Sequence, residues 1–319
     1  MATRQEPTEN RIATLLLLSR GREPSWSRLR PPRAVKEDPK VVVKKRRSEA
    51  SSSSQPPSPR RIAAYLWIVA TCLKILLFPS YRSTDFLVHR HWKAVTRNLP
   101  RTEWYHDDRH VDTVHTLDYP PGFALFVEYV FANNPIANIF CNYYDTDCLA
   151  LWDDPDVEAN IRPQCVAFLR STVIVSDAVW FLAAYVAASL GIKRGFNLRL
   201  FALLIFHPAL LWLDHVHFQY NGLVNGILLL SLCCLAKANN VPPGSSSSSS
   251  GLHVIATALF ALLLTLKHLY MTCGLWYIVY LVRRYVVDNN KYPSLSRLLG
   301  LAVVFGTVIV TPFSFFVSI

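Results

Sequence analysis

The segment Asp214-His215-Val216-His217-Phe218-Gln219-Tyr220-Asn221 holds the densest group of reactive and hydrogen-bonding side chains, and it lies between two apolar runs. Two histidines at i and i+2 beside an aspartate would suggest a metal site. No third and fourth ligand is evident, so we expect no metal. The aromatic and amide side chains instead suit a sugar or a polar headgroup. The segment therefore predicts a turn that lines a polar substrate channel.

Other polar residues stand where apolar runs begin or end. Asp85 follows Ser83-Thr84 shortly after the first run, and Lys267-His268 follows a later one. A carboxylate in the first turn of a helix is favoured by the helix dipole, and its simplest role is an N-cap worth about 1 kcal/mol. Because a charge facing lipid is costly, Lys267 should face a cavity or a partner. Five histidines lack zinc-like spacing and are interpreted as polar loop residues: His89, His91, His106, His110 and His115.

A helix over residues 83–100 should position Asp85. Ser83 or Thr84 supplies its N-cap and Pro100 ends it. One apolar stripe runs along it, made of Val88, Trp92, Val95 and Leu99. A basic row lies on the other side: Arg90, Lys93 and Arg97. This pattern is typical of a helix in a membrane interface, and the basic row is equally well explained as a solvated face.

A second amphipathic helix is predicted after Asp118-Tyr119, where Pro120 and Pro121 fit a first helical turn. Apolar residues then recur at helical spacing: Phe123, Phe126, Val127, Val130 and Phe131. Two interfacial helices in this part of the chain would roof a cavity in the helix bundle below them.

Composition indicates an all-α, multi-span membrane protein. Of the 319 residues 51% are apolar and only 17% are charged, whereas an ordinary soluble domain carries about a quarter charged residues. A polytopic transporter or receptor stays open as a different class. About seven spans are expected, several shorter than the roughly 20 residues that a bilayer requires: Ile62–Phe78, Cys165–Leu190, Leu200–Leu213, Leu223–Ala236, Leu252–Leu266, Tyr270–Val282 and Leu298–Val317.

The excess positive charge is concentrated in residues 1–61, which hold 15 of the 33 Lys and Arg but only 6 of the 22 Asp and Glu. This Ser- and Pro-rich stretch lacks periodicity, so it is interpreted as a disordered, basic cytosolic tail, and no nucleic-acid partner is expected. Residues 62–319 form the membrane module. With the tail in the cytosol, the loop 79–163 falls on the opposite side of the membrane. So do the two polar turns, Asp214–Asn221 and Lys267-His268.

Two local features complete the interpretation. Pro242-Pro243-Gly244 and the serines Ser245–Ser250 predict a flexible linker between spans. Cys141 and Cys148 bracket a short segment on a side expected to be oxidising, so a local disulfide between them is possible.

Four motifs together resemble the endoplasmic-reticulum glucosyltransferases that use dolichyl phosphate glucose and have the GT-C membrane fold. The motifs are Ser83-Thr84-Asp85-Phe86, His89-Arg90-His91-Trp92, Leu117-Asp118-Tyr119-Pro120-Pro121 and the segment Asp214–Asn221. One enzyme of this family adds the first glucose to the dolichol-linked high-mannose oligosaccharide, and a paralogue adds the second. The form His-Val-His-Phe-Gln-Tyr-Asn-Gly and Lys267-His268-Leu269-Tyr270 are closer to the second enzyme, with the first as the alternative.

Two features depart from the family pattern. Leu87 stands where the family often has an acidic residue. Family members are also markedly longer, so the resemblance predicts that the chain is a fragment or an incomplete gene product without the C-terminal helices.

The resemblance implies a glucosyltransferase in the endoplasmic-reticulum membrane with a lumenal active site. It would transfer glucose from dolichyl phosphate glucose to the monoglucosylated dolichol-linked oligosaccharide, forming an α-1,3 bond with inversion and without a metal or cofactor. Asp85 becomes the base that takes the proton of the acceptor hydroxyl. Substrate-binding roles are expected for Arg90, His91, Trp92, Asp118, Tyr119, His215, His217, Gln219, Tyr220, Asn221, Lys267 and His268. Of these, His217, Lys267 and His268 could stabilise the leaving phosphate. The oligomeric state stays open.

Overall fold

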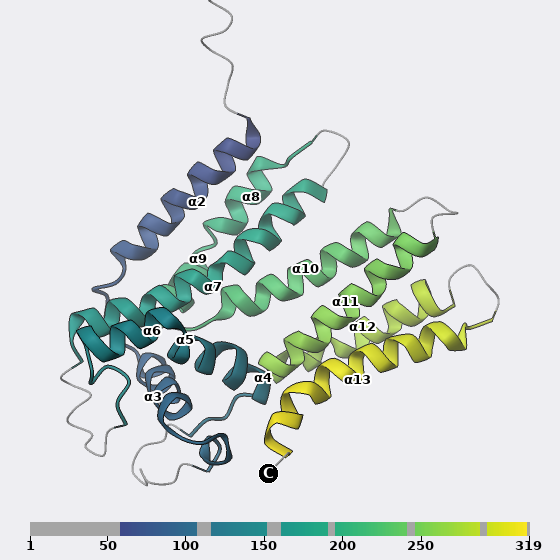
Figure 1. Ribbon diagram of the computed structural model, residues 1–319. Coiled ribbons are helices and arrows are strands. Elements are labelled where there is room, and N and C mark those ends of the chain that lie inside the picture. The colour runs from purple at the N-terminus through teal and green to yellow at the C-terminus, as the bar shows by residue number, and fades with distance from the viewer. Residues whose placement is uncertain are drawn as a thin grey trace, which may run out of the picture. The chain divides into compact units, whose positions relative to one another are not determined.

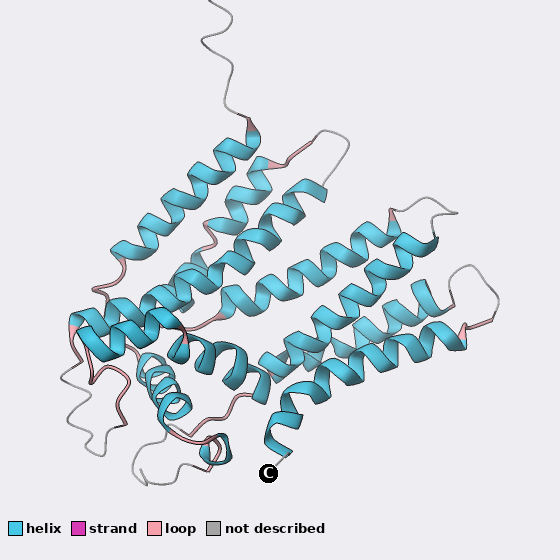
Figure 2. Ribbon diagram, in the orientation of Figure 1, coloured by secondary structure: helices cyan, strands magenta, loops and turns pink. Residues whose placement is uncertain are grey.

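The computed structural model describes residues 58–106, 116–151, 161–190, 195–240, 246–287 and 292–317. These residues belong to one compact unit, Pro57–Ile319, and every regular element among them is a helix (Figure 2). Most of the predicted tail, residues 1–57, lies outside the described residues. The tail was predicted to extend to residue 61, but helix α2 already begins at Pro59.

Long apolar helices run side by side through this unit (Figure 1). They are α2 (Pro59–Leu76), α7 (Pro163–Leu190), α10 (Asn221–Asn239), α11 (Ser246–Leu266) and α13 (Leu295–Val317). Two further stretches, each made of more than one helical element, complete them. One comprises α8 (Leu198–Ile205), α9 (Pro208–Leu210) and the π-helical η5 (Leu211–Val216), and the other comprises α12 (Gly274–Leu281) and the π-helical η7 (Val282–Val286).

Among the described residues, five helical segments are long and apolar enough to cross a membrane, which confirms an all-α multi-span membrane protein. They are Pro163–Leu190, Leu198–Val216, Asn221–Asn239, Ser249–Leu266 and Leu295–Phe316. Helices α2 and α12 stand at the other two predicted positions without reaching that standard of length and apolarity, so the number seven stays a prediction. The linker prediction is wrong for its last residues, since α11 begins at Ser246, and residues 242–245 of the predicted linker lie outside the described residues.

Shorter helices form a layer across one end of the long ones in Figure 1, here called the end layer. It consists of α3 (Thr84–Asn98), η1 (Arg101–Glu103), α4 (Pro121–Phe123), η2 (Ala124–Tyr129), α5 (Val130–Asn133), α6 (Pro135–Ile139) and η3 (Phe140–Tyr144). The predicted start and end of the first helix are confirmed. Ser83 is the N-cap of α3, and its hydroxyl accepts from the Phe86 N–H at 3.3 Å.

The solvated-face interpretation of α3 is wrong. Arg90 and Lys93 are 3% and 0% exposed, because η2 and α5 pack over this side of the helix. The second helix begins at Pro121 as predicted, but its apolar stripe is divided. Phe123 and Val127 are buried, whereas Phe126 and Val130 are exposed. The π-helical η2 explains the division, since a π-turn changes the angular spacing on which a 3.6-residue stripe depends.

The disulfide prediction is also wrong in its partner. Cys148 is bonded to Cys165 at the start of α7, and Cys141 is a buried free thiol. Cys141 lies within the helical turn η3, which turns its side chain into the core, while Cys148 follows that turn and packs against α7. The bond joins the segment that follows η3 to the start of α7.

Candidate active site

Asp85, in the first turn of α3, presents a partly exposed carboxylate. Its side chain is 34% exposed. Gln219 Nε2 donates to Asp85 Oδ2 at 2.5 Å, and His217 Nδ1 lies 3.2 Å from the same oxygen. The other oxygen, Oδ1, has no hydrogen bond within the described part of the chain. The capping interpretation is therefore wrong, since Ser83 caps the helix, and Asp85 keeps one oxygen for another partner.

The two side chains that reach Asp85 alternate with two buried aromatic rings. Phe218 is fully buried, with its ring centroid 5.0 Å from that of Phe86. Tyr220 is 4% exposed, and its hydroxyl shares a 2.7 Å hydrogen bond with Thr172. Phe218 has φ of 69°, a left-handed conformation that costs free energy in a residue with a side chain. Burial of the rings holds this turn, which directs His217 and Gln219 toward Asp85.

Asp214 anchors the end of this turn. Its carboxylate accepts from the backbone N–H groups of Asn221 at 3.0 Å and Gly222 at 2.5 Å, and from Asn221 Nδ2 at 3.0 Å. Free N–H groups at a helix start need such partners, so Asp214 serves the first turn of α10. Its side chain is therefore engaged by the protein and is not presented to a substrate.

Lys267 supplies a positive charge close to Asp85. Its Nζ donates to Asn221 Oδ1 at 3.3 Å and stands 5.4 Å from the ring centroid of Tyr119. Burial lowers the pKa of Lys267, against the opposing effect of the Asp214 and Asp85 carboxylates. Burial, together with nearby carboxylates, raises the pKa of Tyr119 to about 12, so this phenol is neutral at pH 7 and is no competitor for the role of base.

A buried ion pair lies beneath the aromatic rings. Lys93 Nζ and Glu128 Oε2 are 2.6 Å apart, and His89 Nδ1 is 2.6 Å from Glu128 Oε1. Burial alone would lower the pKa of Lys93 and raise that of Glu128. Their mutual attraction outweighs burial, so the pKa of Lys93 is raised and that of Glu128 lowered. Lys93 Nζ also lies 4.9 Å from the Tyr220 ring centroid, which links the pair to the turn.

Charged residues inside the long helices hold the same turn, and the sequence analysis missed them. Arg170 on α7 donates to the backbone carbonyls of Leu77, Tyr81 and His215, and so joins the end of α2 and the chain before α3 to η5. Asp177, also on α7, lies 2.7 Å from Lys74 Nζ and 2.8 Å from His215 Nε2. Charges within apolar runs were the available signal, since such residues face protein rather than lipid.

The structure brings together six of the predicted site residues: Asp85, Tyr119, His217, Gln219, Asn221 and Lys267. The others lie differently. Arg90 is buried and donates to the carbonyls of Asp147, Cys148 and Ala150, while Trp92, His215 and Tyr220 are also buried. His91 is half-buried, and Asp118 and His268 are exposed. Every substrate-binding role stays a prediction. His110 and His115 lie outside the described residues.

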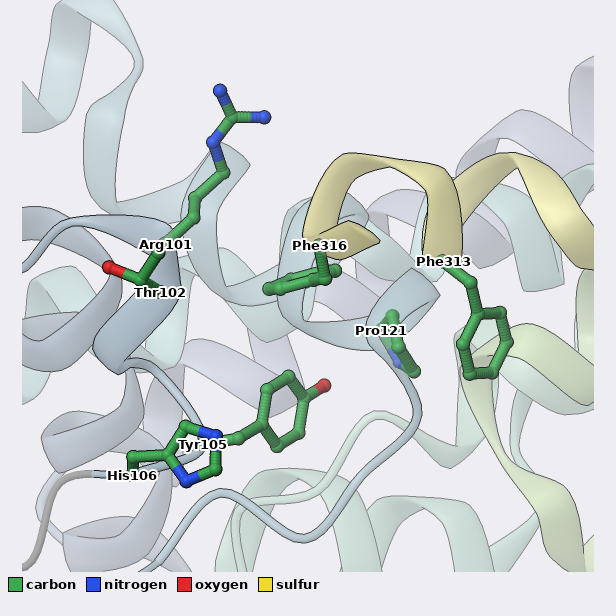
Figure 3. Close-up of a pocket in the computed structure, with 7 residues that line it drawn as sticks. All are labelled: Arg101, Thr102, Tyr105, His106, Pro121, Phe313 and Phe316. Atoms are coloured by element: carbon green, nitrogen blue, oxygen red, sulfur yellow. The ribbon is translucent and has the colours of Figure 1, made fainter. Parts of the chain in front are cut away.

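The structure has a pocket of about 400 Å³ with residues from three parts of the chain around it (Figure 3). Its walls come from the segment after α3, the start of α4 and the end of α13: Arg101, Thr102, Tyr105, His106, Pro121, Phe313 and Phe316. The Tyr105 hydroxyl donates to the Tyr119 carbonyl at 2.9 Å. This hydrogen bond joins one wall of the pocket to Tyr119, whose ring lies beneath the Lys267 ammonium group. Aromatic rings and a proline make the pocket suitable for an apolar chain.

Comparison with known proteins supports the resemblance seen in the motifs. Residues 70–319 match the ALG6, ALG8 glycosyltransferase family. The chain is 40% identical over 230 residues to the Arabidopsis thaliana protein named dolichyl pyrophosphate Glc1Man9GlcNAc2 alpha-1,3-glucosyltransferase, a match that covers 72% of this chain and 40% of the relative.

Proteins of the same name in two other organisms are similar. The identity is 37% over 237 residues for Schizosaccharomyces pombe, covering 73% of this chain and 42% of the relative. It is 35% over 242 residues for Mus musculus, covering 73% and 41%. The chain thus spans about two fifths of the length of these relatives. With the family match extending over residues 70–319, the chain belongs to the ALG6, ALG8 glycosyltransferase family.

Proposed function

We propose that this chain carries the active site of an α-1,3-glucosyltransferase in the lumenal face of the endoplasmic-reticulum membrane. The donor is dolichyl phosphate glucose, and the acceptor is the dolichol-linked oligosaccharide Glc1Man9GlcNAc2. Family membership and the shared name of the similar proteins support this acceptor. The observation that carries the proposal is the Asp85 carboxylate, partly exposed, with one oxygen held by Gln219 and His217 and the other without a hydrogen bond among the described residues.

In the proposed reaction, Asp85 Oδ1 accepts the proton of an acceptor hydroxyl. The hydroxyl oxygen attacks C1 of the donor glucose from the face opposite the phosphate, and the bond from C1 to the phosphate oxygen breaks. Dolichyl phosphate leaves with the electron pair, the configuration at C1 inverts, and Asp85 holds the proton. A phosphate monoester is a stable anion, so no acid is needed to protonate the leaving group.

Lys267 and His217 are the groups best situated to stabilise the negative charge on the leaving phosphate. Lys267 is half-buried beside Asn221, and a partly desolvated cation interacts with an anion more strongly than one in water. The aromatic pocket next to Tyr119 suits the first isoprenoid units of a dolichyl chain that enters from the bilayer.

The test is a transfer assay on the full-length protein in lipid nanodiscs, with radiolabelled dolichyl phosphate glucose and two separate acceptors. Man9GlcNAc2 and Glc1Man9GlcNAc2, each linked to dolichyl pyrophosphate, differ only in the terminal glucose. We expect transfer to the second alone, because a site that hydrogen-bonds a terminal sugar loses those partners when the sugar is absent. Transfer to the first alone would assign the chain to the paralogous step, and transfer to neither would refute the proposal.

A further inference from the structure

A continuous line of hydrogen bonds connects two carboxylates across the turn. Asn221 Nδ2 donates to Asp214 Oδ1 at 3.0 Å and to Gln219 Oε1 at 2.7 Å. Gln219 Nε2 in turn donates to Asp85 Oδ2 at 2.5 Å. On the opposite side of the Asn221 amide, Lys267 Nζ donates to Asn221 Oδ1 at 3.3 Å. Two side-chain amides therefore lie between the buried Asp214 and the partly exposed Asp85.

The groups at the ends of this line determine which way each amide points. Asp214 Oδ1 already accepts from the backbone N–H of Asn221, and an ammonium group can only donate hydrogen bonds. Asn221 must then turn its NH2 group toward Asp214 and its oxygen toward Lys267. The second N–H of Asn221 meets the oxygen of Gln219, and Gln219 is left with only its NH2 group for Asp85.

We propose that Asn221 is a positioning residue that fixes the direction of the Gln219 amide, so that an N–H rather than an oxygen faces Asp85. This inference rests on the proposed function, in which Asp85 is the base. With the amide reversed, the Gln219 oxygen would face the Asp85 carboxylate. Two acceptors form a hydrogen bond only if one of them carries a proton, so a reversed Gln219 would favour protonated Asp85, which is no base.

The pH dependence of glucose transfer therefore tests the proposal, because the loss of a purely structural contact would leave the pH profile unchanged. Other charged or titratable groups that act on Asp85 come from several elements: His217 after η5, Lys267 after α11 and Tyr119 before α4. Lys267 and Asp214 contact the Asn221 side chain, so a charge added at position 221 acts on both of them as well. A shift in the acid limb of kcat/KM then reports the Gln219 amide and the charge added at 221.

Asn221→Asp is the decisive variant, because it keeps the shape of the side chain and, when ionised beside Lys267, can only accept hydrogen bonds. Gln219 would turn its NH2 group toward the new carboxylate and its oxygen toward Asp85. We expect the acid limb of kcat/KM for glucose transfer to move up by about one pH unit or more, with a roughly tenfold loss near the former midpoint that is regained at higher pH. Asn138→Asp is the matched control, since it adds the same charge at an exposed asparagine that pairs with Arg97.

Testing Asn221→Asp in the Gln219→Leu variant distinguishes the effect of the Gln219 amide from the effect of the added charge. In Gln219→Leu there is no amide to turn, so adding Asn221→Asp should shift the acid limb only by the smaller part that the added charge itself causes. If Asn221→Asp lowers the melting temperature so far that no folded protein is recovered, Asn221→Ala replaces it, and a smaller shift in the same direction is expected because Gln219 is then free to turn.

Three results separate the possibilities. A wild-type pH profile in the position-221 variants would overturn the positioning role while the wild-type protein still transfers glucose. A shift that persists undiminished in the Gln219→Leu background would also overturn it, since the added charge would then act directly. Absence of transfer by the wild-type protein would instead refute the proposed function.

Discussion

Glu128→Gln tests how much the end layer depends on its buried ion pair. Glu128 and Lys93 are both 0% exposed, and their charged atoms are 2.6 Å apart. Glutamine preserves the size and one accepting oxygen, but it leaves Lys93 without a counter-charge in a site closed to water. Breaking such a pair from one side costs about 3–5 kcal/mol, because the remaining charge must be desolvated or must lose its proton.

The double variant Lys93→Met/Glu128→Gln removes both charges and should recover most of that loss. Buried ion pairs replaced as a unit by neutral side chains of similar volume are often close to neutral in stability. Denaturant unfolding in mixed detergent micelles, with the wild type and both variants at pH 7, measures the difference. Equal losses in the single and double variants would refute the account, since the cost would then come from packing and not from an unpaired charge.

The same pair sets the pH range in which the end layer is most stable. The folded pKa of Glu128 lies below its ordinary 4.5, so its contribution is complete above that value and is lost as the pH falls through the folded pKa. The folded pKa of Lys93 lies above its ordinary 10.5, so its contribution is complete below that value and is lost as the pH rises through the folded pKa. Between these limits the contribution of this pair to the unfolding free energy should not change with pH. A pH series that compares the wild type with the double variant measures this.

Two further changes test the contacts that hold the turn and the end layer. Gly222→Ala would place a methyl group against the Asp177 carboxylate and 3.2 Å from Asp214 Oδ2, so thermal unfolding should show a loss of about 1–3 kcal/mol in stability. Gly300→Ala is the control and should be neutral or stabilising, because a Cβ there meets nothing within 4 Å. Equal effects of the two substitutions would contradict crowding at Gly222. Replacing Cys148 and Cys165 together by alanine opens a loop of 17 residues and should cost about 3 kcal/mol of unfolding free energy. An unchanged melt would show that packing alone holds that segment.

The start of α3 and the start of the second helix could be predicted, because capping and proline rules act within a few neighbouring residues. The burial of the Arg90 and Lys93 side chains could not be predicted from the sequence. A basic row beside an apolar stripe predicts a solvated face only if nothing packs over it, and η2 and α5, which bury Arg90 and Lys93, are distant in the chain.

The candidate site shows the same division between local and tertiary information. The segment Asp214–Asn221 and Lys267 stood out by residue type, and the structure brings them to Asp85. What each side chain does depends on tertiary contacts. Asp214 accepts from backbone N–H groups, His215 contacts Asp177, and within the described part of this segment His217 and Gln219 are the residues that reach Asp85. Phe218 was expected to suit a sugar, but the ring is fully buried.

The central claim is that Asp85 is the base, and Asp85→Asn tests it most directly. Asparagine keeps the size and an oxygen that can accept from Gln219, so the fold and its melting temperature should be unchanged, but it is a very poor base at neutral pH. Glucose transfer from dolichyl phosphate glucose to Glc1Man9GlcNAc2 linked to dolichyl pyrophosphate should fall roughly 10²–10⁴-fold in the full-length protein. Transfer near the wild-type rate, with an unchanged melt, would contradict the account.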